Sequence, residues 1–288
     1  ASLIAALVAD EMVLRIEDLD PDRSKQEHID AIMRDLEWFG FEWTDAVVYQ
    51  SAEEQQARYL RACEALEAQG LVYPCFCTRA DLHSARAPHV GEEFIYQNTC
   101  KDILPEVHTE RMSTERYALR LDVAAAPSPL CFTDTFQGKS CFDLVHEAGD
   151  FIIKRSDGVF AYQLAVVVDD AASGIDSVVR GVDLLTSTPK QIYLQQLLGL
   201  PTPVYGHVPI FVDENGRKLS KRNKDASLGY LIEELSLSAE AILGYLAYCS
   251  GIIPGWEAMS IAELKREACL SALDGKRTIV WQPPMPRV

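Results

Sequence analysis

Hydrophobic residues at helical spacing predict two helices in the first quarter of the chain, over residues 24–40 and 51–70. Each segment begins with Ser-x-x-Glu, a pattern typical of a capping box, and each ends in glycine. Apolar residues of the first segment recur every three or four positions, at Ile29, Ile32, Met33, Leu36 and Phe39.

Continuous apolar runs predict buried strands. They cover residues 12–16, 164–168 and 204–212. A further helix is predicted between the last two runs, because Thr188-Pro189 is typical of a helix start and Gly199 of a helix end. Strands that alternate with helices at this spacing indicate an α/β fold built on a parallel sheet.

The alternation stops within residues 71–155, which hold a cysteine cluster, several prolines and short β-like runs such as 116–121. This pattern indicates an insertion between two halves of the sheet. After residue 223 the pattern becomes helical, with a capping box at Ser260 and Glu263. The predicted parts are the first half of the sheet domain (1–70), the insertion (71–155), the second half of the sheet domain (156–225) and a helical C-terminal region (226–288).

The beginning of the chain does not follow this pattern. Residues 2–7 are helical in character, yet only a few residues separate them from the strand predicted at Met12. A two-turn helix spans only about 11 Å, too little to cross back over a sheet. We therefore expect that residues are absent before Ala1 and near positions 8–11.

Composition limits the class of protein. The chain has 288 residues, of which 48% are apolar and 24% charged, as in a soluble globular protein. It has no apolar run near the ~20 residues of a membrane span, and no secretory signal at its start. The net charge of −16 argues against coating nucleic acid non-specifically, but permits a local basic face. Five scattered cysteines are interpreted as buried free thiols in a reducing cytoplasm: Cys63, Cys131, Cys141, Cys249 and Cys269.

One short segment is strongly basic. Residues 216–224 carry five cations, at Arg217, Lys218, Lys221, Arg222 and Lys224, directly after an apolar run. Flexible lysine side chains beside a glycine and a serine suit an anion-binding loop for phosphates. The alternative is an ordinary solvated turn.

Charged residues also follow the first predicted strand, at 15–20. Parallel sheets bind ligands at this end, and Glu17 there is placed to accept hydrogen bonds from a substrate ammonium. A helix-capping acidic cluster is the alternative. Arg180 follows another apolar stretch, and arginine recognises carboxylates through two parallel hydrogen bonds. Asp169 and Asp170 either hold the geometry of this site or form a solvated turn.

The insertion contains a candidate metal site. Cys75 and Cys77 form a C-x-C pair, and Tyr96 and Cys100 follow. Zinc takes four ligands in structural sites, so this set is one candidate, with His83 and His89 as rival ligands. Buried thiols without a metal are the alternative.

Taken together, these motifs resemble the class I aminoacyl-tRNA synthetases of the glutamyl type. The run 155–170 (RSDGVFAYQLAVVVDD) is similar to that family, as are 179–185 and the helix that starts at Thr188-Pro189. Residues 218–222 (KLSKR) resemble the KMSKS signature, and 15–20 (RIEDLD) match RIEDxD. The resemblance covers residues 2 to 225.

Within the family, the chain resembles the short paralogues that glutamylate the queuosine base of tRNA(Asp). Only about 65 residues follow the basic loop, too few for a large anticodon-binding region. The resemblance implies a Rossmann-type catalytic domain, a ligase activity on L-glutamate and ATP with Mg²⁺, and one structural Zn²⁺. It also implies a cytoplasmic monomer that binds the tRNA(Asp) anticodon loop and no membrane.

The resemblance further implies roles for individual residues. Arg180 binds a substrate carboxylate, and Glu17 and Tyr162 hold the amino-acid end. Lys221, with Lys218, binds ATP and stabilises its phosphates in the transition state. The implied zinc ligands are those of the candidate site above, Cys75, Cys77, Tyr96 and Cys100.

One departure from the family keeps two alternatives open. The family's HIGH-like ATP motif precedes the segment that matches residues 2–7, and this chain does not contain it. The alternatives are a truncated glutamyl-tRNA synthetase that charges the acceptor end, and a non-catalytic, zinc-bearing RNA-binding module.

Overall fold

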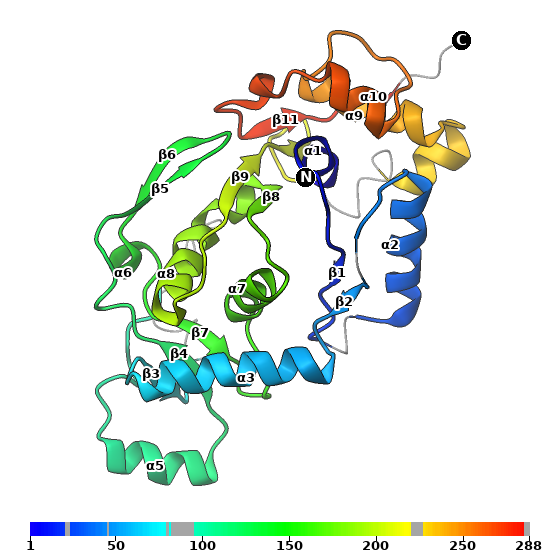
Figure 1. The fold of residues 1–288 in the computed structure, drawn as a ribbon. Helices are drawn as coiled ribbons and strands as arrows, with labels where there is room; N and C mark the ends of the chain where they lie inside the picture. The colour runs from blue at the N-terminus through cyan, green and yellow to red at the C-terminus, as the bar shows by residue number, and fades with distance from the viewer. Residues whose placement is uncertain (21–23, 45, 79–80, 82–94, 220–226, 285–288) are drawn as a thin grey trace.

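A computed structural model describes residues 1–288 except 21–23, 45, 79–80, 82–94, 220–226 and 285–288. The chain forms a central group of helices with short strand pairs around it (Figure 1). The first elements are α1 (Ser2–Val8), β1 (Arg15–Ile16), α2 (Gln26–Trp38), β2 (Val48–Tyr49) and α3 (Glu53–Ala68). Residues 9–14 connect α1 to β1 and form no helix or strand, so the strand predicted from residue 12 is shorter than expected.

Parallel pairing is confirmed, but the described strands form three separate two-stranded parallel sheets and not one continuous sheet. β1 pairs with β2, and β8 (Ser177–Gly181) pairs with β9 (Val204–Val208), in which Arg180 lies opposite His207. The apolar run 204–212 is not one strand. It divides into β9 and β10 (Ile210–Val212), and β10 pairs instead with the C-terminal β11 (Thr278–Val280).

The strand predicted at residues 164–168 is wrong, because these residues lie in α7 (Tyr162–Ala172). Leu164 to Asp169 are all buried, since α3 and α8 both pack against α7. A helix enclosed in this way is apolar on every side, and its short apolar run cannot be told from that of a buried strand.

The helix predicted after residue 188 is confirmed as α8 (Thr188–Leu198), which follows the 3₁₀ helix η1 (Val182–Ser187). Gly199 ends it in the left-handed conformation, with φ 64°. α3, α7 and α8 share the largest apolar core, which includes Tyr59, Leu66, Leu164, Val167 and Leu194.

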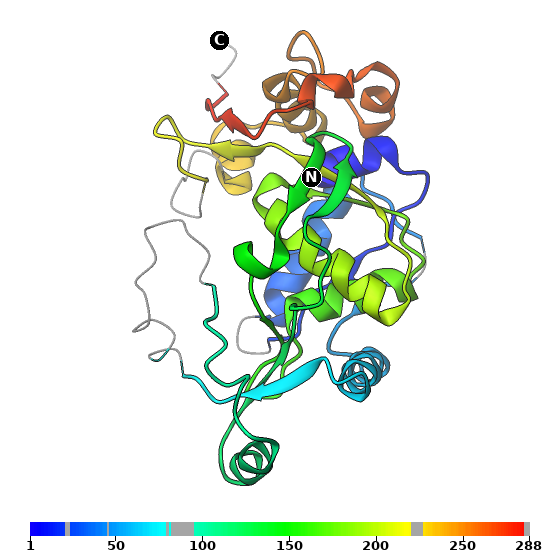
Figure 2. The ribbon, with the colours of Figure 1, turned by 90° about the vertical axis from the view of Figure 1, so that its left-hand side faces the viewer.

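Residues 71–155 form antiparallel structure, in contrast to the parallel pairs. β4 (Ala118–Leu121) lies between β3 (Val72–Cys75) and β7 (Phe151–Lys154) in one sheet. α5 (Pro105–Thr114) lies beyond this sheet, at the end of the molecule away from α9 and α10 (Figure 1, Figure 2). β5 (Leu130–Asp134) and β6 (Gly138–Phe142) form a hairpin followed by α6 (Leu144–Glu147), and β5 contacts β9.

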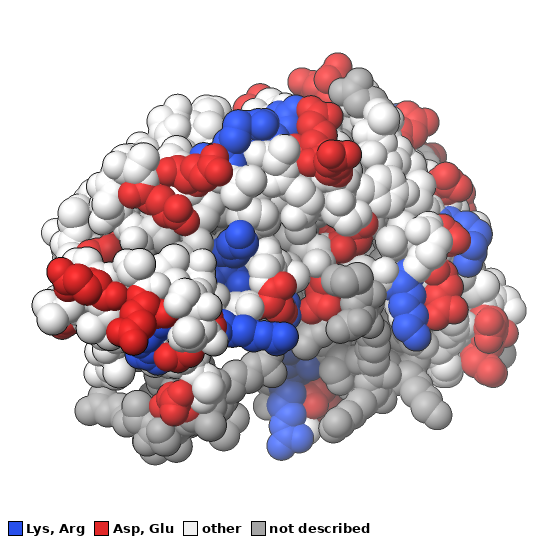
Figure 3. Space-filling view, turned by 90° about the horizontal axis from the view of Figure 1, so that it is seen from below, with Lys and Arg blue, Asp and Glu red and all other residues white. Residues whose placement is uncertain are grey.

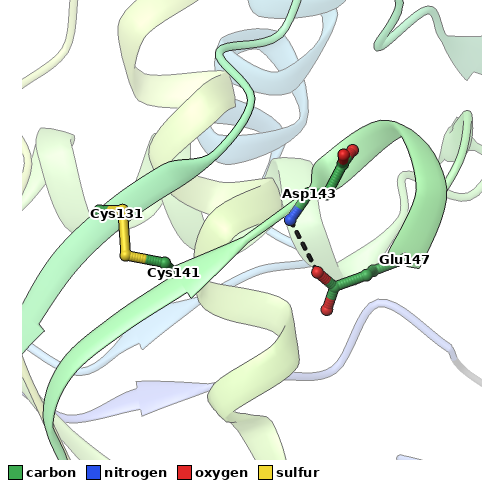
Figure 4. Close-up of a disulfide and its surroundings, with 4 residues drawn as sticks. All are labelled: Cys131, Cys141, Asp143 and Glu147. Carbon is green, nitrogen blue, oxygen red and sulfur yellow. Dashed lines mark hydrogen bonds between the residues drawn. A yellow bond between two sulfur atoms is a disulfide. The ribbon is translucent and has the colours of Figure 1, made fainter.

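The prediction that the scattered cysteines are free buried thiols is wrong for one pair. Cys131 and Cys141 lie directly opposite each other in the β5–β6 hairpin and form a disulfide (Figure 4). Their pairing depends on the hairpin register, which sequence spacing alone did not reveal. Of the remaining three, Cys63 is buried, Cys249 is partly exposed and Cys269 is exposed.

The C-terminal region is largely helical, as predicted, but it also contains the strand β11. It contains the π helix η3 (Tyr230–Glu234), α9 (Ala239–Ser250), α10 (Ile261–Glu267) and the 3₁₀ helix η4 (Leu270–Leu273). The capping box of Ser260 and Glu263 is confirmed at the start of α10. α1 packs against α10 and β8. This packing brings the N-terminal helix into contact with the C-terminal region (Figure 1).

The other two predicted capping boxes are wrong. α2 begins after Lys25 and α3 after Ala52, and neither N-cap side chain accepts a hydrogen bond from the helix. Ser51 lies one residue too early to cap α3, and its backbone N–H and hydroxyl both donate to Asp18. In the described part of the chain, no helix has the length and apolar character needed to cross a membrane.

Candidate active site and cysteine cluster

A cavity of about 520 Å³ lies between β1 and β8. Glu17, Tyr162 and Arg180, three residues singled out in the sequence, line it together with Arg15 and Asp170. They come from three elements: the chain at and just after β1, the two ends of α7 (Tyr162 in its first turn and Asp170 in its last), and β8. The cavity therefore combines acidic, phenolic and guanidinium groups, a set that suits a zwitterionic ligand such as an amino acid.

Arg180 is held on one edge of its guanidinium group. Its Nε lies 3.0 Å from Nε2 of His207, and its Nη2 lies 2.7 Å from the Thr188 hydroxyl and 3.5 Å from the Leu184 carbonyl. None of these contacts uses Nη1, although the Tyr162 phenol also interacts with the guanidinium group. This nitrogen remains available for a ligand in the cavity.

Arg15 is the second arginine of the cavity and is held by two carboxylates of α7. Its Nη1 donates to Asp170 at 2.6 Å, and its Nε lies 3.7 Å from Asp169. Asp169 is completely buried and accepts hydrogen bonds from Gln50 and Tyr59. Asp169 and Asp170 thus lie in a helix that positions Arg15, and they are not a solvated turn.

Glu17 and Tyr162 are more accessible. The Glu17 carboxylate lies 3.5 Å from Nη2 of Arg15, and 47% of its side-chain surface is exposed. Burial raises the pKa of the Tyr162 phenol, although the charge of Arg180 opposes the increase. Tyr162 therefore remains a neutral hydrogen-bonding group beside Arg180 near neutral pH.

The basic loop is described only in part. The ammonium of Lys218 donates to Asp183 in η1 at 2.5 Å, which ties the start of the loop to the segment that follows β8. Lys221, the residue expected to contact ATP phosphates, lies outside the described residues.

The predicted metal ligands converge within the insertion. The sulfur atoms of Cys75, Cys77 and Cys100 all lie within 4.8 Å of one another. The Tyr96 hydroxyl lies 3.4 Å from the sulfur of Cys75 and 3.6 Å from that of Cys77, and it accepts the backbone N–H of Cys100 at 2.9 Å. Three sulfurs and one phenol oxygen are a donor set that fits zinc.

The surroundings of Cys75 favour a thiolate, whereas burial raises the pKa of the neighbouring Cys77 thiol to about 11. Burial opposes ionisation of Cys75, but interactions with Tyr96 and with the Arg120 cation outweigh it and lower the pKa of the thiol. Arg120 also lies over the Tyr96 ring, 3.7 Å from its centroid. The rival ligands His83 and His89 lie outside the described residues.

Sequence reasoning missed two residues that contact the site. His207 and Asp134 are both buried, and their side chains lie 2.5 Å apart. The only signal available for His207 was its place within the apolar run predicted as a strand at 204–212, and no strand was predicted around Asp134. The 73 positions that separate them in the chain concealed their contact.

The described surface is not uniformly basic. On the face seen from below in Figure 3, acidic and basic side chains lie among one another. A local basic face for RNA is thus not evident on the described part of this side.

Known proteins similar to this chain identify its family. Residues 3–267 match the family described as tRNA synthetases class I (E and Q), catalytic domain. The Glutamyl-Q tRNA(Asp) synthetase of Nitratidesulfovibrio vulgaris is 40% identical over 269 residues, which cover 88% of this chain and 80% of the relative. That of Geobacter sulfurreducens is 45% identical over 237 residues, which cover 79% of this chain and 72% of the relative.

Solved structures agree at the level of the fold. Glutamate-tRNA synthetase from Elizabethkingia anophelis aligns with a TM-score of 0.79 at 21% identity, over 98% of this chain and 63% of that one. The glutamate tRNA ligase of Elizabethkingia meningosepticum, solved with its amino acid, aligns with a TM-score of 0.79 at 22% identity. The alignment covers 98% of this chain and 62% of that one. This chain thus spans less than two thirds of either structure. The chain belongs to the class I tRNA synthetases (E and Q), and its sequence places it among the glutamyl-Q tRNA(Asp) synthetases.

Proposed function

We propose that this protein activates L-glutamate with ATP and transfers the glutamyl group to the queuosine base in the anticodon of tRNA(Asp). The identity of 38–45% to curated Glutamyl-Q tRNA(Asp) synthetases is the observation that carries this proposal. In the first step, a glutamate carboxylate attacks the α-phosphorus of ATP and pyrophosphate leaves. In the second step, a nucleophile of the queuosine base attacks the activated carbonyl and AMP leaves.

The residues around the cavity support the activation step. Nη1 of Arg180 meets a glutamate carboxylate, and the Glu17 carboxylate accepts from the ammonium beside the Tyr162 phenol. None of these groups needs to act as a nucleophile, since the carboxylate of the substrate does so. Their contribution is to position the substrate and to compensate its charges.

The basic loop completes the proposed site. ATP enters with Mg²⁺, which when bound supplies positive charge to the phosphates. Lys218 and Lys221 contribute mobile ammonium groups that follow the phosphates as pyrophosphate departs. The contact between Lys218 and Asp183 supports this role, because it ties the loop to the segment that follows Arg180.

We propose a structural role for the cysteine cluster. Cys75, Cys77, Tyr96 and Cys100 would hold one Zn²⁺ with all four positions taken by the protein, which leaves none open for catalysis. Zinc bound there would fix the start of the insertion (71–155) between the two halves of the catalytic domain (1–70 and 156–225), ahead of the helical region (226–288).

The names of the curated relatives bear on which end of the tRNA reaches the cavity. They point to tRNA(Asp) and its queuosine, and therefore to the anticodon loop. Proteins read RNA sequence mostly through splayed loop bases, so a modified base that enters a pocket is physically reasonable. We place this reaction in the cytoplasm.

The deciding experiment supplies the complete protein with ATP, labelled glutamate and either queuosine-containing tRNA(Asp) or the same tRNA without queuosine. Label should appear only on the first, and it should survive removal of the 3′-terminal adenosine. If labelling is lost with that adenosine, the protein charges the acceptor end as a truncated glutamyl-tRNA synthetase. If no glutamate-dependent pyrophosphate exchange occurs, it is a non-catalytic RNA-binding module.

A further inference from the structure

Arg180 faces a buried histidine across two parallel strands. Arg180 in β8 and His207 in β9 occupy the same register position, and Nε of the arginine lies 3.0 Å from Nε2 of the imidazole. His207 is completely buried, whereas Arg180 reaches the cavity. The histidine therefore touches the proposed substrate-binding group from the side opposite to the ligand.

The contacts of His207 define which of its nitrogens carries the proton. Nδ1 lies 2.5 Å from Oδ2 of Asp134, a carboxylate that accepts hydrogen bonds. Nε2 lies 3.0 Å from the Arg180 guanidinium, which only donates, and 3.2 Å from the Thr188 hydroxyl. The Asp134 carboxylate needs a donor and the Arg180 Nε–H needs an acceptor, and both are satisfied when the proton is on Nδ1 and a lone pair is on Nε2.

Asp134 is itself held firmly at the end of β5. Its Oδ1 accepts the backbone N–H groups of Phe136, Gln137 and His207 at 2.9–3.0 Å. Its other oxygen, Oδ2, is thereby aimed at the imidazole. Asp134 thus fixes the rotation and the proton of His207, and His207 in turn occupies Nε of Arg180.

We propose that Asp134 and His207 are positioning residues for Arg180 that direct its Nη1 into the cavity, toward the carboxylate of glutamate. The inference rests on the proposed function. Because His207 and Thr188 occupy the Nε and Nη2 edge of the guanidinium, the substrate is met by Nη1 alone or by the Nη1–Nη2 end. An arginine without these contacts would lose side-chain entropy when the substrate binds. The contacts with His207 and Thr188 restrict the Arg180 side chain before binding, so less entropy is lost in the binding step.

The sharpest test is Asp134→Asn, which changes no volume. The new amide oxygen keeps the three backbone hydrogen bonds, while the amide N–H faces Nδ1 of His207. The proton must then move to Nε2, where it points at the N–H of Arg180. We expect the KM for glutamate to rise about 10- to 100-fold. The KM for ATP should change by less than about threefold, because the disturbed group does not face the phosphates.

A matched pair of variants separates positioning from packing. His207→Gln presents an amide oxygen near the place of Nε2 and can still accept from Arg180. His207→Asn presents its amide near Nδ1 and leaves Nε of Arg180 without an acceptor. We expect the asparagine variant to raise the glutamate KM more than the glutamine variant does. His28 is exposed, so His28→Asn serves as the control and should leave the glutamate KM unchanged.

A spectroscopic readout keeps the inference testable if a variant folds poorly or the proposed function fails. In nitrogen NMR of the unmodified protein, Nε2 of His207 should show the signal of an unprotonated ring nitrogen, and Asp134→Asn should convert it to a protonated one. A protonated Nε2 in the unmodified protein would overturn the inference. So would equal glutamate KM values for the glutamine and asparagine variants. Absence of any glutamate activation by the unmodified protein would instead refute the proposed function.

Discussion

The hydroxyl of Tyr59 in α3 lies 2.7 Å and 2.8 Å from the two carboxylate oxygens of Asp169 in α7, and both side chains are completely buried. Gln50 donates to the same carboxylate at 2.7 Å, and Arg15 lies beside it. A buried carboxylate is tolerated only when its oxygens are satisfied. This contact therefore joins the core of the protein to the arginine that lines the cavity.

Removal of the Tyr59 hydroxyl should destabilise the fold. Tyr59→Phe leaves the ring in place but deprives buried Asp169 of a donor, which costs about 1–3 kcal/mol of unfolding free energy. Urea denaturation of the two proteins measures the difference. Tyr248→Phe, at an exposed tyrosine of α9, is the matched control and should stay within about 0.5 kcal/mol. An equal loss in both variants would contradict the importance of the contact.

Arg180→Ala should severely weaken the binding of glutamate. It removes a charge-assisted pair and leaves the substrate carboxylate uncompensated, which costs about 2–5 kcal/mol of binding free energy. Arg180→Lys should rescue poorly, because an ammonium cannot contact His207, Thr188 and the substrate together. Glutamate-dependent pyrophosphate exchange measures both variants, with exposed Arg34→Ala as the control. Near-normal activation by Arg180→Ala would remove this residue from the site.

Lys221 should act on the transition state more than on the ground state. Its expected role rests on the KLSKR motif, since it lies outside the described residues. Lys221→Ala should therefore lower kcat while the KM for glutamate changes less. Steady-state kinetics separates the two constants, and Lys139→Ala, at an exposed lysine of β6, is the control. A variant whose only defect is a raised KM would speak against this role.

The cysteine cluster should hold zinc with the help of a phenol oxygen. Tyr96→Phe removes the fourth donor and leaves the three sulfurs, so zinc should be lost faster to a chelator without being absent from the purified protein. Zinc content before and after chelation measures this loss. Cys269→Ser changes an exposed cysteine away from the cluster and should retain zinc normally. Unchanged retention in Tyr96→Phe would exclude the phenol as a ligand.

The sequence predicted those elements whose signals are local. The helix from Thr188 to Leu198 and the capping box at Ser260 depend on residues within one or two turns, and both are confirmed. Leu164 to Val168 were misassigned because full burial removes the periodicity that distinguishes a helix from a strand. Ser51 matched a capping box, yet Asp18, 33 positions away, takes its hydroxyl.

Contacts within the candidate site divide in the same way. Arg180, Tyr162 and Glu17 could be named from motifs, because each motif is continuous in the chain. The two residues that hold Arg180 could not be named from motifs, because Asp134 comes from an antiparallel hairpin and His207 from a parallel strand. Only the register of β8 with β9, and the contact of β5 with β9, bring these residues together.

The pH dependence of stability should report on Asp134. Burial of its charge opposes ionisation, but hydrogen bonds from the side chain and backbone of His207 and from two further backbone N–H groups outweigh it and lower the pKa. An aspartate in the unfolded chain titrates near ~3.9. Since the folded state binds this proton less tightly, Asp134 contributes stability that is present above about pH 4 and is lost as the pH falls toward its folded pKa.

Asp134→Asn isolates this contribution, because every other carboxylate is common to both proteins. The unmodified protein should exceed the variant in unfolding free energy most clearly above about pH 5, and the difference should shrink below about pH 4. Urea denaturation at several pH values measures it. A difference that stays constant from neutral to acid pH would mean that the variant loses packing rather than charge. The carboxylate of Asp134 would then not be what holds His207, and through it Arg180, in place.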